Sequence, residues 1–364
     1  MAVFLAVAVD EATEGDAVMV AYMGSPEAID GAAYPLGPVL AVEQIQARLK
    51  QEGRHLAYVV PPESGALGFT VACLVAAKLG LAVVDGDGAG RAVPSLPMLT
   101  FAAQHVDPKP AVLVSQDGLT VELDVTPAKG GARGDRQHQE DVSVIVEQMM
   151  RPIVADPEFK QFGGLAMWVM TPAKLRDAVP ITGTLTRALE FGQALQQGAF
   201  KSVDALLAAL HERWGVRACS LFPTGVLLGA AVDTSGGFDL GTVTIKAAAQ
   251  TAEVLYQNES LLAWASDRAQ PLCMAPDSIC YFFEGPGDAV ASNGDLVEDN
   301  GGLNPAYKGR PVTVIGLSAN PQLRQRGGLI LDSFMQQVNQ LGYRGPYVPV
   351  EKLAAMSAQE VSHG

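Results

Sequence analysis

Short apolar runs alternate with helix-like patterns over the first part of the chain. Runs of strand length lie at residues 17–23, 56–61 and 81–85. Between them, residues 39–53 place apolar side chains on one helical face, and residues 65–80 form an almost wholly apolar helix with Ser64 as its expected N-cap. Strands that are apolar on both faces and separated by helices are typical of a parallel sheet covered by helices. This part is therefore predicted to be an α/β domain with a largely parallel sheet.

Two further elements extend this domain. Residues 111–125 predict a hairpin that turns at Gln116-Asp117-Gly118, because alternating apolar positions flank an Asp-Gly pair. Residues 140–158 predict a helix, and residues 164–170 predict a strand after it. We therefore expect the N-terminal domain to occupy residues 1–170.

The pattern changes from about residue 180. Two helices, at 185–197 and 202–213, precede many short strands that are separated by the turn signals TSGG, GPGD, SNGD and DNGG. The expected strands lie at 216–222, 225–232, 240–249, 252–258, 261–266, 271–274, 278–283 and 312–317. Closely spaced short strands with turn residues between them predict a smaller, β-rich C-terminal domain, which we place at residues 171–364.

Composition narrows the class of protein. Of the 364 residues, 48% are hydrophobic and 18% are charged, which allows two cores and argues against extensive disorder. A net charge of −14 makes nucleic acid and anionic membranes unsuitable partners, because phosphate binding needs clustered Lys and Arg. The four cysteines form no CxxC pair, and the opening MAVFLAVAVD lacks the basic start of a signal peptide. We therefore expect a cytoplasmic protein with a small-molecule substrate and a first strand at its start.

Polar residues gather where three of the expected strands end. The junctions read YMGSPE (22–27), PPESG (61–65) and DGDGAGR (85–91). The carboxyl ends of parallel strands lie at one edge of a sheet, and ligands bind outside that edge. The side chains that we expect to line one crevice there are Glu27, Glu63, Asp85, Asp87 and Arg91.

The glycine-rich loop at residues 85–91 matches no nucleotide or calcium motif. Its alternating glycines fail the GxGxxG fingerprint, and the chain has no Walker A sequence. The pair Asp85-x-Asp87 lacks the later ligands of a calcium loop. A rigid loop around a small ligand fits better, and two chemical uses stay open. The carboxylates either hold a divalent metal ion that activates water, or one acts as a general acid or base while Arg91 stabilises developing negative charge.

The C-terminal part offers three weaker candidates for substrate binding. Asn258 and Glu259 stand between two apolar runs, where a hairpin turn is the alternative explanation. Asp277 precedes a strand and follows a proline, where a simple turn is again the alternative.

The stretch GLAVVDGDGAGRAVPSLPMLTF (80–101), with PPESGALG (61–68) and YQNESLLAW (256–264), resembles the S-methyl thiohydantoin desulfurase-like family. Members of this family accompany hydantoinase/oxoprolinase-type proteins. The resemblance implies an α/β domain followed by a β-rich domain. It also implies hydrolysis of the C–S bond of an S-methylated hydantoin-like ring, with release of methanethiol. The implied site contains Glu63, Asp85, Asp87 and Arg91, closed by Asn258 and Glu259.

We therefore predict a hydrolase that acts on a hydantoin-like cyclic amide. The alternative is a non-catalytic partner subunit of a hydantoinase/oxoprolinase-type enzyme, because the sequence starts after the point where family members carry a glycine-rich loop. The sequence leaves open the bound metal, the substrate, and the choice between a homo-oligomer and a complex with a hydantoinase-type protein.

Overall fold

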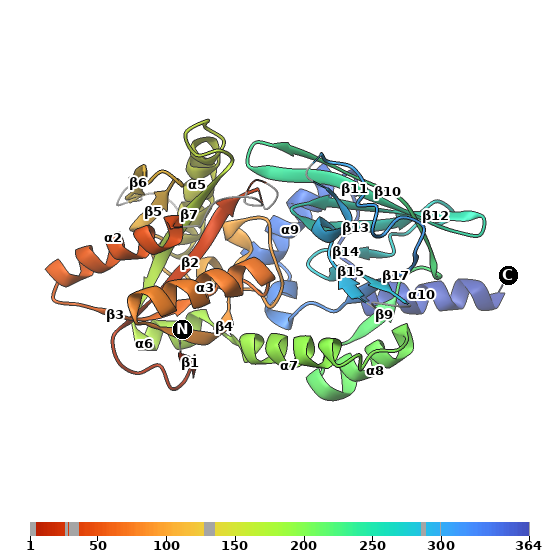
Figure 1. Cartoon of the computed structure of the whole chain (residues 1–364), viewed down its shortest axis with the longest axis horizontal. Helices are drawn as coiled ribbons and strands as arrows, with labels where there is room; N and C mark the ends of the chain where they lie inside the picture. Colours follow the sequence, from red (N-terminus) through yellow and green to blue (C-terminus); the bar gives the residue numbers. More distant parts are fainter. Residues whose placement is uncertain are drawn as a thin grey trace. The chain divides into compact units, whose positions relative to one another are not determined.

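A computed structural model describes residues 5–25, 28, 36–126, 135–284, 289–298 and 300–363 (Figure 1). For residues 135–141, 289 and 357–363 it describes the backbone alone. The chain packs as two compact units. The first comprises Met1–Ala188, Ser235–Phe238 and Asn320–Leu331, and the second comprises Leu189–Thr234, Asp239–Ala319 and Asp332–Gly364. The elements from Pro172 to Thr182 therefore pack with the first unit.

The first unit is built on one mixed sheet. Its order is β1 (Leu5–Ala8), β4 (Ala82–Asp87), β3 (Leu56–Val60), β2 (Asp16–Gly24), β7 (Phe162–Met170), β5 (Ala111–Val114) and β6 (Thr120–Leu123). Strands β1, β4, β3 and β2 are parallel neighbours, and β5 points the same way. Strands β7 and β6 run in the opposite direction, as does β8 (Ile181–Thr182) beside β4. The predicted α/β fold with a mostly parallel sheet is confirmed, and so is the hairpin formed by β5 and β6.

Helices cover this sheet because the apolar positions that define them face it. The helices are α2 (Gly37–Gln51), α3 (Ala66–Leu79), α4 (Thr100–Ala103), α5 (Asp135–Val154) and α6 (Pro172–Ala178). Helix α7 (Thr184–Gln196) begins in this unit, and its residues from Leu189 onward pack with the second unit. Buried side chains of α2 and α3, such as Ile45 and Val75, form one core with Val18 and Val59 of the strands. Helix α2 starts against β7, where a Cβ on Gly164 would lie 2.0 Å from the carbonyl carbon of Gly37. Only glycine permits this approach.

The second unit contains an antiparallel sheet. Its order is β14 (Cys273–Met274), β13 (Glu259–Ala265), β12 (Gln250–Gln257), β11 (Phe238–Ala247), β10 (Gly225–Ser235), β17 (Pro311–Leu317), β15 (Ser278–Phe283) and β16 (Ala289–Ala291), with β9 (Ala218–Ser220) beside β17. One core lies against the sheet and includes Val254, Tyr281 and Phe283. A second core joins Phe200 and Leu206 to the other face of β15, and Leu206 belongs to α8 (Val203–Trp214). The predicted β-rich C-terminal domain is confirmed.

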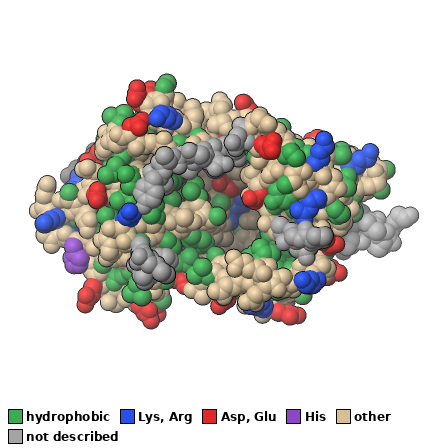
Figure 2. Space-filling view, in the orientation of Figure 1, with side chains coloured by type: hydrophobic (Ala, Val, Ile, Leu, Met, Phe, Trp, Pro, Cys, Tyr) green, Lys and Arg blue, Asp and Glu red, His purple; other side chains and the backbone are tan. Residues whose placement is uncertain are grey.

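The remaining helices lie towards the end of the chain. They are α9 (Leu329–Gln340) and α10 (Val350–His363). Among the described residues, no helix combines the length and the apolar character needed to cross a membrane. On the face shown in Figure 2, the Lys and Arg side chains of the described residues are scattered, and Asp and Glu side chains lie between them.

Candidate functional site

Two of the three predicted junctions are joined by hydrogen bonds. The backbone N–H of Gly88, after β4, donates to the carbonyl of Pro62, after β3, at 2.9 Å. The Ser64 hydroxyl donates to Asp87 Oδ2 at 2.6 Å, and the Val93 N–H donates to Glu63 Oε2 at 2.5 Å. These contacts follow from the parallel pairing of β3 with β4, which brings the two carboxyl ends together. The structure therefore places Glu63 and Asp87 in one cluster.

Gly88 explains why this loop is rich in glycine. A Cβ at this position would lie 2.6 Å from Cε2 of Phe101 and 2.8 Å from the carbonyl oxygen of Pro62. Contacts this short are not tolerated, so a side chain would push the two junctions apart. Gly90 has φ +68°, which also favours glycine.

Asp87 is a fully buried carboxylate with donors on both oxygens. Its Oδ1 accepts from the N–H groups of Ala89 at 2.8 Å and Gly90 at 2.5 Å, and its Oδ2 accepts from Ser64. Burial raises the pKa of Asp87, while the hydrogen bonds from Ser64 and the loop amides oppose that rise. The result is a carboxylate in a fixed orientation that polarises the Ser64 hydroxyl.

The prediction that Ser64 caps helix α3 is wrong. The N-cap is Gly65, in an extended conformation and without a side-chain hydrogen bond. A serine cap is worth about 1 kcal/mol. Leaving a buried carboxylate without a donor costs more than that. Ser64 therefore points to Asp87 instead of the first turn of α3.

Glu63 is the strongest acid–base candidate. Its carboxylate is partly buried at the start of the β3–α3 junction. Burial raises the pKa of Glu63 to about 7, and the negative charge of Asp87 adds to the rise, whereas the Val93 N–H and the positive charge of Arg91 oppose it. A carboxyl group that titrates near neutral pH is suited both to donate and to accept a proton.

Arg91 supplies a buried positive charge to the cluster. It is 8% exposed, and its Nε donates to the carbonyl of Ala92 at 2.8 Å. Its charge stabilises the ionised form of Glu63, which links the guanidinium to the carboxyl electrostatically. The cluster thus combines an oriented carboxylate, a protonatable carboxyl and a cation.

Asp85 has a different set of partners. Its carboxylate accepts from the N–H groups of Leu185 at 3.0 Å and Thr186 at 3.2 Å, and from the Thr186 hydroxyl at 2.5 Å. These donors belong to the first turn of α7, whose backbone N–H groups have no partner within the helix. Asp85 therefore caps a helix that lies 100 residues further along the chain.

The other predicted residues are distributed as follows. Glu27 lies outside the described residues. Asn258 connects β12 to β13 at φ +58°, and its side-chain oxygen accepts from the Asp239 N–H at 2.8 Å. Glu259 begins β13 opposite Gln257.

Asp277 is fully buried in the second unit. It accepts from the N–H of Ala319 at 2.8 Å, the hydroxyl of Tyr347 at 3.0 Å and the N–H of Val350 at 2.8 Å. The substrate-binding roles of Glu27, Asn258, Glu259 and Asp277 stay predictions.

The cluster does not suit a divalent metal ion. In the part of the chain that the structure describes, no three His, Cys, Asp or Glu side chains come together as ligands. Both oxygens of Asp87 and one oxygen of Glu63 already accept hydrogen bonds from the protein. Carboxylate oxygens that already accept hydrogen bonds from the protein have less capacity left for a metal ion, so acid–base chemistry fits these residues better.

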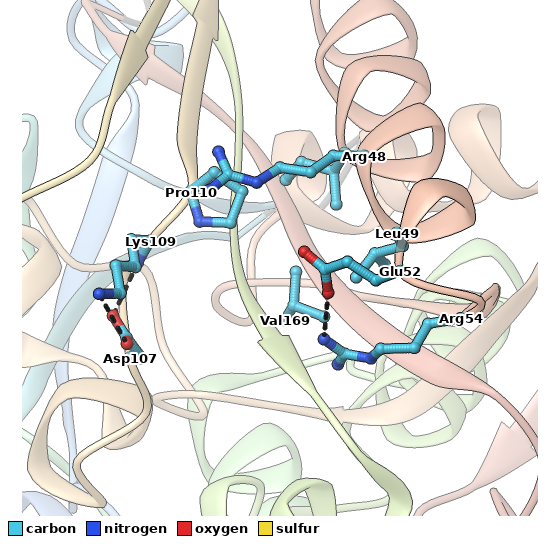
Figure 3. Close-up of a pocket in the computed structure, with 9 residues that line it drawn as sticks. Arg48, Leu49, Glu52, Arg54, Asp107, Lys109, Pro110 and Val169 are labelled. Carbon is cyan, nitrogen blue, oxygen red and sulfur yellow. Dashed lines mark hydrogen bonds and ion pairs between the residues drawn. The ribbon is translucent and has the colours of Figure 1, made fainter.

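A separate cavity of about 260 Å³ lies by the C-terminal end of α2 and the start of β5 (Figure 3). It contains three bases, and each has an acidic partner. Arg54 pairs with Asp16 and Glu52, Lys109 pairs with Asp107, and Arg48 pairs with Glu122 and Asp124. Because its charges are neutralised internally, we assign no ligand to it.

Sequence reasoning missed Ser64 as a partner of Asp87, and it missed two residues of α5, Glu147 and Arg151. The latter form a hydrogen-bonded ion pair with 2.6 Å between Arg151 Nε and Glu147 Oε1. Their spacing of four residues is a recognisable signal for a pair on one helix face. Nothing in that spacing indicates which loop the pair contacts.

Comparison with known proteins identifies the family. The model of the S-Me-THD-like N-terminal domain matches residues 4–125, and that of the S-Me-THD-like C-terminal domain matches residues 140–350. The chain belongs to the S-Me-THD-like family. The resemblance seen in the sequence is thereby confirmed. Both junctions of the cluster lie within the S-Me-THD-like N-terminal domain.

A solved structure shares this S-Me-THD-like fold. The X-ray crystal structure of a protein from Chromobacterium violaceum, from the Northeast Structural Genomics Consortium, is 52% identical in sequence, with a TM-score of 0.85. The match covers 95% of this chain and 87% of that one. No curated protein matches the chain.

Proposed function

We propose that this protein is a hydrolase of a hydantoin-like cyclic amide, and that it cleaves the C–S bond of an S-methyl thiohydantoin to release methanethiol. The observation that carries the proposal is the Glu63–Asp87–Arg91 cluster, in which a carboxyl with a pKa of about 7 lies beside a fixed carboxylate and a buried cation. Membership of the S-Me-THD-like family supports the substrate class.

The roles follow from the hydrogen bonds. A water oxygen bonds to the ring carbon that carries sulfur, and the water proton passes through the Ser64 hydroxyl to Asp87, to which Ser64 already donates. The C–S bond breaks, and protonated Glu63 gives its proton to the departing methanethiolate. Arg91 stabilises the negative charge that develops on the ring. Asp87 then returns its proton to Glu63, which completes the cycle.

Asp85 is left out of this scheme. Among the described residues, the donors to its carboxylate belong to the first turn of α7. We therefore assign Asp85 to holding α7, and we assign the chemistry to Glu63, Asp87 and Arg91.

The test is release of methanethiol from S-methyl thiohydantoin, measured with a thiol-reactive dye. We expect turnover by the wild-type protein and a loss of at least about 100-fold in kcat for Glu63→Gln and Asp87→Asn, the range typical of general acid–base groups. Glu43→Gln, at an exposed position of α2, is the matched control and keeps full activity. Equal turnover by Glu63→Gln and wild type would refute the assignment.

The competing proposal is a non-catalytic partner subunit of a hydantoinase/oxoprolinase-type enzyme. It predicts no thiol release by the chain alone and co-purification with such an enzyme. If the wild-type protein releases methanethiol by itself and its elution volume is unchanged by the enzyme, this alternative fails.

A further inference from the structure

The segment that follows the site loop is held by two residues of α5, the buried Glu147 and the partly buried Arg151. Arg151 Nη2 donates to the carbonyl of Pro94 at 2.7 Å, and Glu147 Oε2 accepts from the N–H of Leu96 at 3.0 Å. The same two side chains pair with each other at 2.6 Å. Their exposed side-chain fractions are only 14% and 9%. The segment therefore has a charge-assisted anchor, and such hydrogen bonds are about twice as strong as neutral ones.

Arg151 also contacts a short segment from much later in the sequence. Its Nη1 donates to the carbonyl of Gly237 at 2.8 Å, and its guanidinium carbon lies 3.9 Å from the centre of the Phe238 ring. The N–H of Gly237 donates in turn to Gln161 Oε1 at 3.0 Å. Residues Ser235–Phe238 pack as part of the first unit. One guanidinium thus joins α5 to segments that lie 57 and 86 residues away from it.

Gln161 extends these contacts to a further junction. Its carbonyl accepts from the N–H of Ser25, directly after β2, at 3.0 Å. A Cβ on Gly24 would lie 2.1 Å from that carbonyl oxygen, so the approach requires glycine. The turn at Ser235–Phe238 is therefore connected through Arg151 to the loop after β4 and through Gln161 to the end of β2.

We propose that Arg151, held by the turn Ser235–Phe238, is a positioning residue for Glu63. Arg151 fixes the Pro94 carbonyl, and Pro94 directly follows Val93, whose N–H binds the Glu63 carboxylate. Holding the Pro94 carbonyl restricts the backbone on the C-terminal side of Val93, and it thereby limits the directions that the Val93 N–H can take. Arg151 acts on Glu63 only through this backbone, since its own nitrogens are occupied by Glu147, Gly237 and Pro94.

The consequence is a defined change in the titration of Glu63. The described groups that act on its carboxyl are the charge of Asp87, the charge of Arg91 and the Val93 N–H. Of these, the Val93 N–H and Arg91 favour the ionised form, and Asp87 opposes it. Releasing Pro94 weakens the Val93 hydrogen bond, so the pKa of Glu63 is expected to rise.

The experiment measures that pKa directly. Protein labelled with ¹³C at the glutamate side-chain carboxyl is titrated by NMR, and the Glu63 signal is identified by its loss in Glu63→Gln. We expect Arg151→Gln to raise the pKa of Glu63 by roughly half to one pH unit, the equivalent of one hydrogen bond. Arg48→Gln, which removes an exposed ion-paired arginine of the same unit, is the control and leaves the pKa unchanged.

Two further variants keep the test decisive. Phe238→Leu removes the ring beneath the guanidinium and leaves every hydrogen-bonding group in place. It is therefore expected to raise the pKa of Glu63 by less than Arg151→Gln does. This variant replaces Arg151→Gln in the test if Arg151→Gln does not fold. Arg151→Lys keeps the positive charge but loses the planar guanidinium. Its Glu63 pKa is expected to lie between the values in wild type and in Arg151→Gln. An unchanged Glu63 pKa in any folded Arg151 variant, or in Phe238→Leu if none folds, overturns the proposal.

The inference deepens the proposed function, since it concerns the same acid–base group, but its main readout needs no substrate. If the protein turns over methanethiol while the pKa stays constant in the variants, the positioning role fails alone. If the pKa shifts but no variant or wild type has activity, the proposed function fails alone. If both hold, the pH dependence of kcat/KM in Arg151→Gln shifts with the measured pKa, whereas KM changes less than kcat.

Discussion

Replacing Glu63 by glutamine removes a titrating group and keeps a hydrogen-bond acceptor for the Val93 N–H. The folded protein holds the Glu63 proton with a pKa of about 7, against a usual value of 4.5. A carboxyl whose pKa is raised by folding favours the folded state most at low pH. That contribution is complete below about pH 4.5 and is lost as the pH rises through 7. Glutamine stays neutral throughout, so the variant does not lose this contribution.

The magnitude follows from the two pKa values. The difference between 4.5 and about 7, at about 1.4 kcal/mol for each pH unit, is on the order of 3 kcal/mol. Most of it falls between about pH 4 and pH 8, the range that spans the two pKa values. Over that range we expect the free energy of unfolding of Glu63→Gln to increase relative to wild type by about 2–3 kcal/mol. Contributions from titrating groups that do not interact with Glu63 cancel in this difference, whereas Asp87, whose charge acts on Glu63, adds to it.

The assay is urea unfolding at a series of pH values, followed by tryptophan fluorescence. Among the three tryptophans, Trp168 is buried in β7 of the first unit, whereas Trp214 and Trp264 belong to the second. A background with Trp214→Phe and Trp264→Phe therefore reports on the unit that contains Glu63. Glu43→Gln in the same background is the control. Its free energy of unfolding should differ from that of the parent by an amount that does not vary with pH. If the difference in the free energy of unfolding for Glu63→Gln is also independent of pH, the conclusion that burial raises the pKa of Glu63 is refuted.

Three further outcomes are expected. Asp85→Ala removes the acceptor for the first turn of α7 and should cost about 1–2 kcal/mol in thermal unfolding, and kcat/KM should stay within about threefold of wild type; a large loss of kcat/KM without loss of stability would return Asp85 to the chemistry. The kcat/KM for methanethiol release should fall as the pH rises above 7, because Glu63 must be protonated to act as the acid; a rate that rises through this range would contradict that role. Gly88→Ala would place a methyl group against Phe101 and Pro62 and should destabilise the first unit by about 1–3 kcal/mol, as overpacking does; an unchanged urea midpoint would show that the two junctions are free to separate.

Local patterns were sufficient to predict the main elements of the first unit. Strands β2, β3 and β4 and helices α2 and α3 begin and end within three residues of the predicted bounds. Each is defined by its own apolar periodicity and by residues such as Gly53 and Gly80 that end helices. The general location of the cluster was also predictable, because parallel strands bring their ends to one edge of the sheet.

The hydrogen-bond partners of the individual carboxylates in the cluster were not predictable. Asp85 and Asp87 stand two residues apart at the end of one strand, yet one binds α7 and the other binds Ser64. The choice depends on donors 100 residues away in one case and 23 in the other, and no local pattern encodes that pairing. Arg151 poses the same difficulty, since two of its acceptors are backbone carbonyls that carry no sequence signal.

The buried Asp277 in the second unit also limits how far the chain can be truncated at its C-terminus. Two donors to its carboxylate, the hydroxyl of Tyr347 and the N–H of Val350, come from the last twenty residues, and Val350 begins α10. A stop codon before Tyr347 would remove both of these donors from a fully buried carboxylate. Tyr347 and Val350 therefore help to satisfy a buried charge inside the second unit, and shortened expression clones should retain residues through at least the first turn of α10.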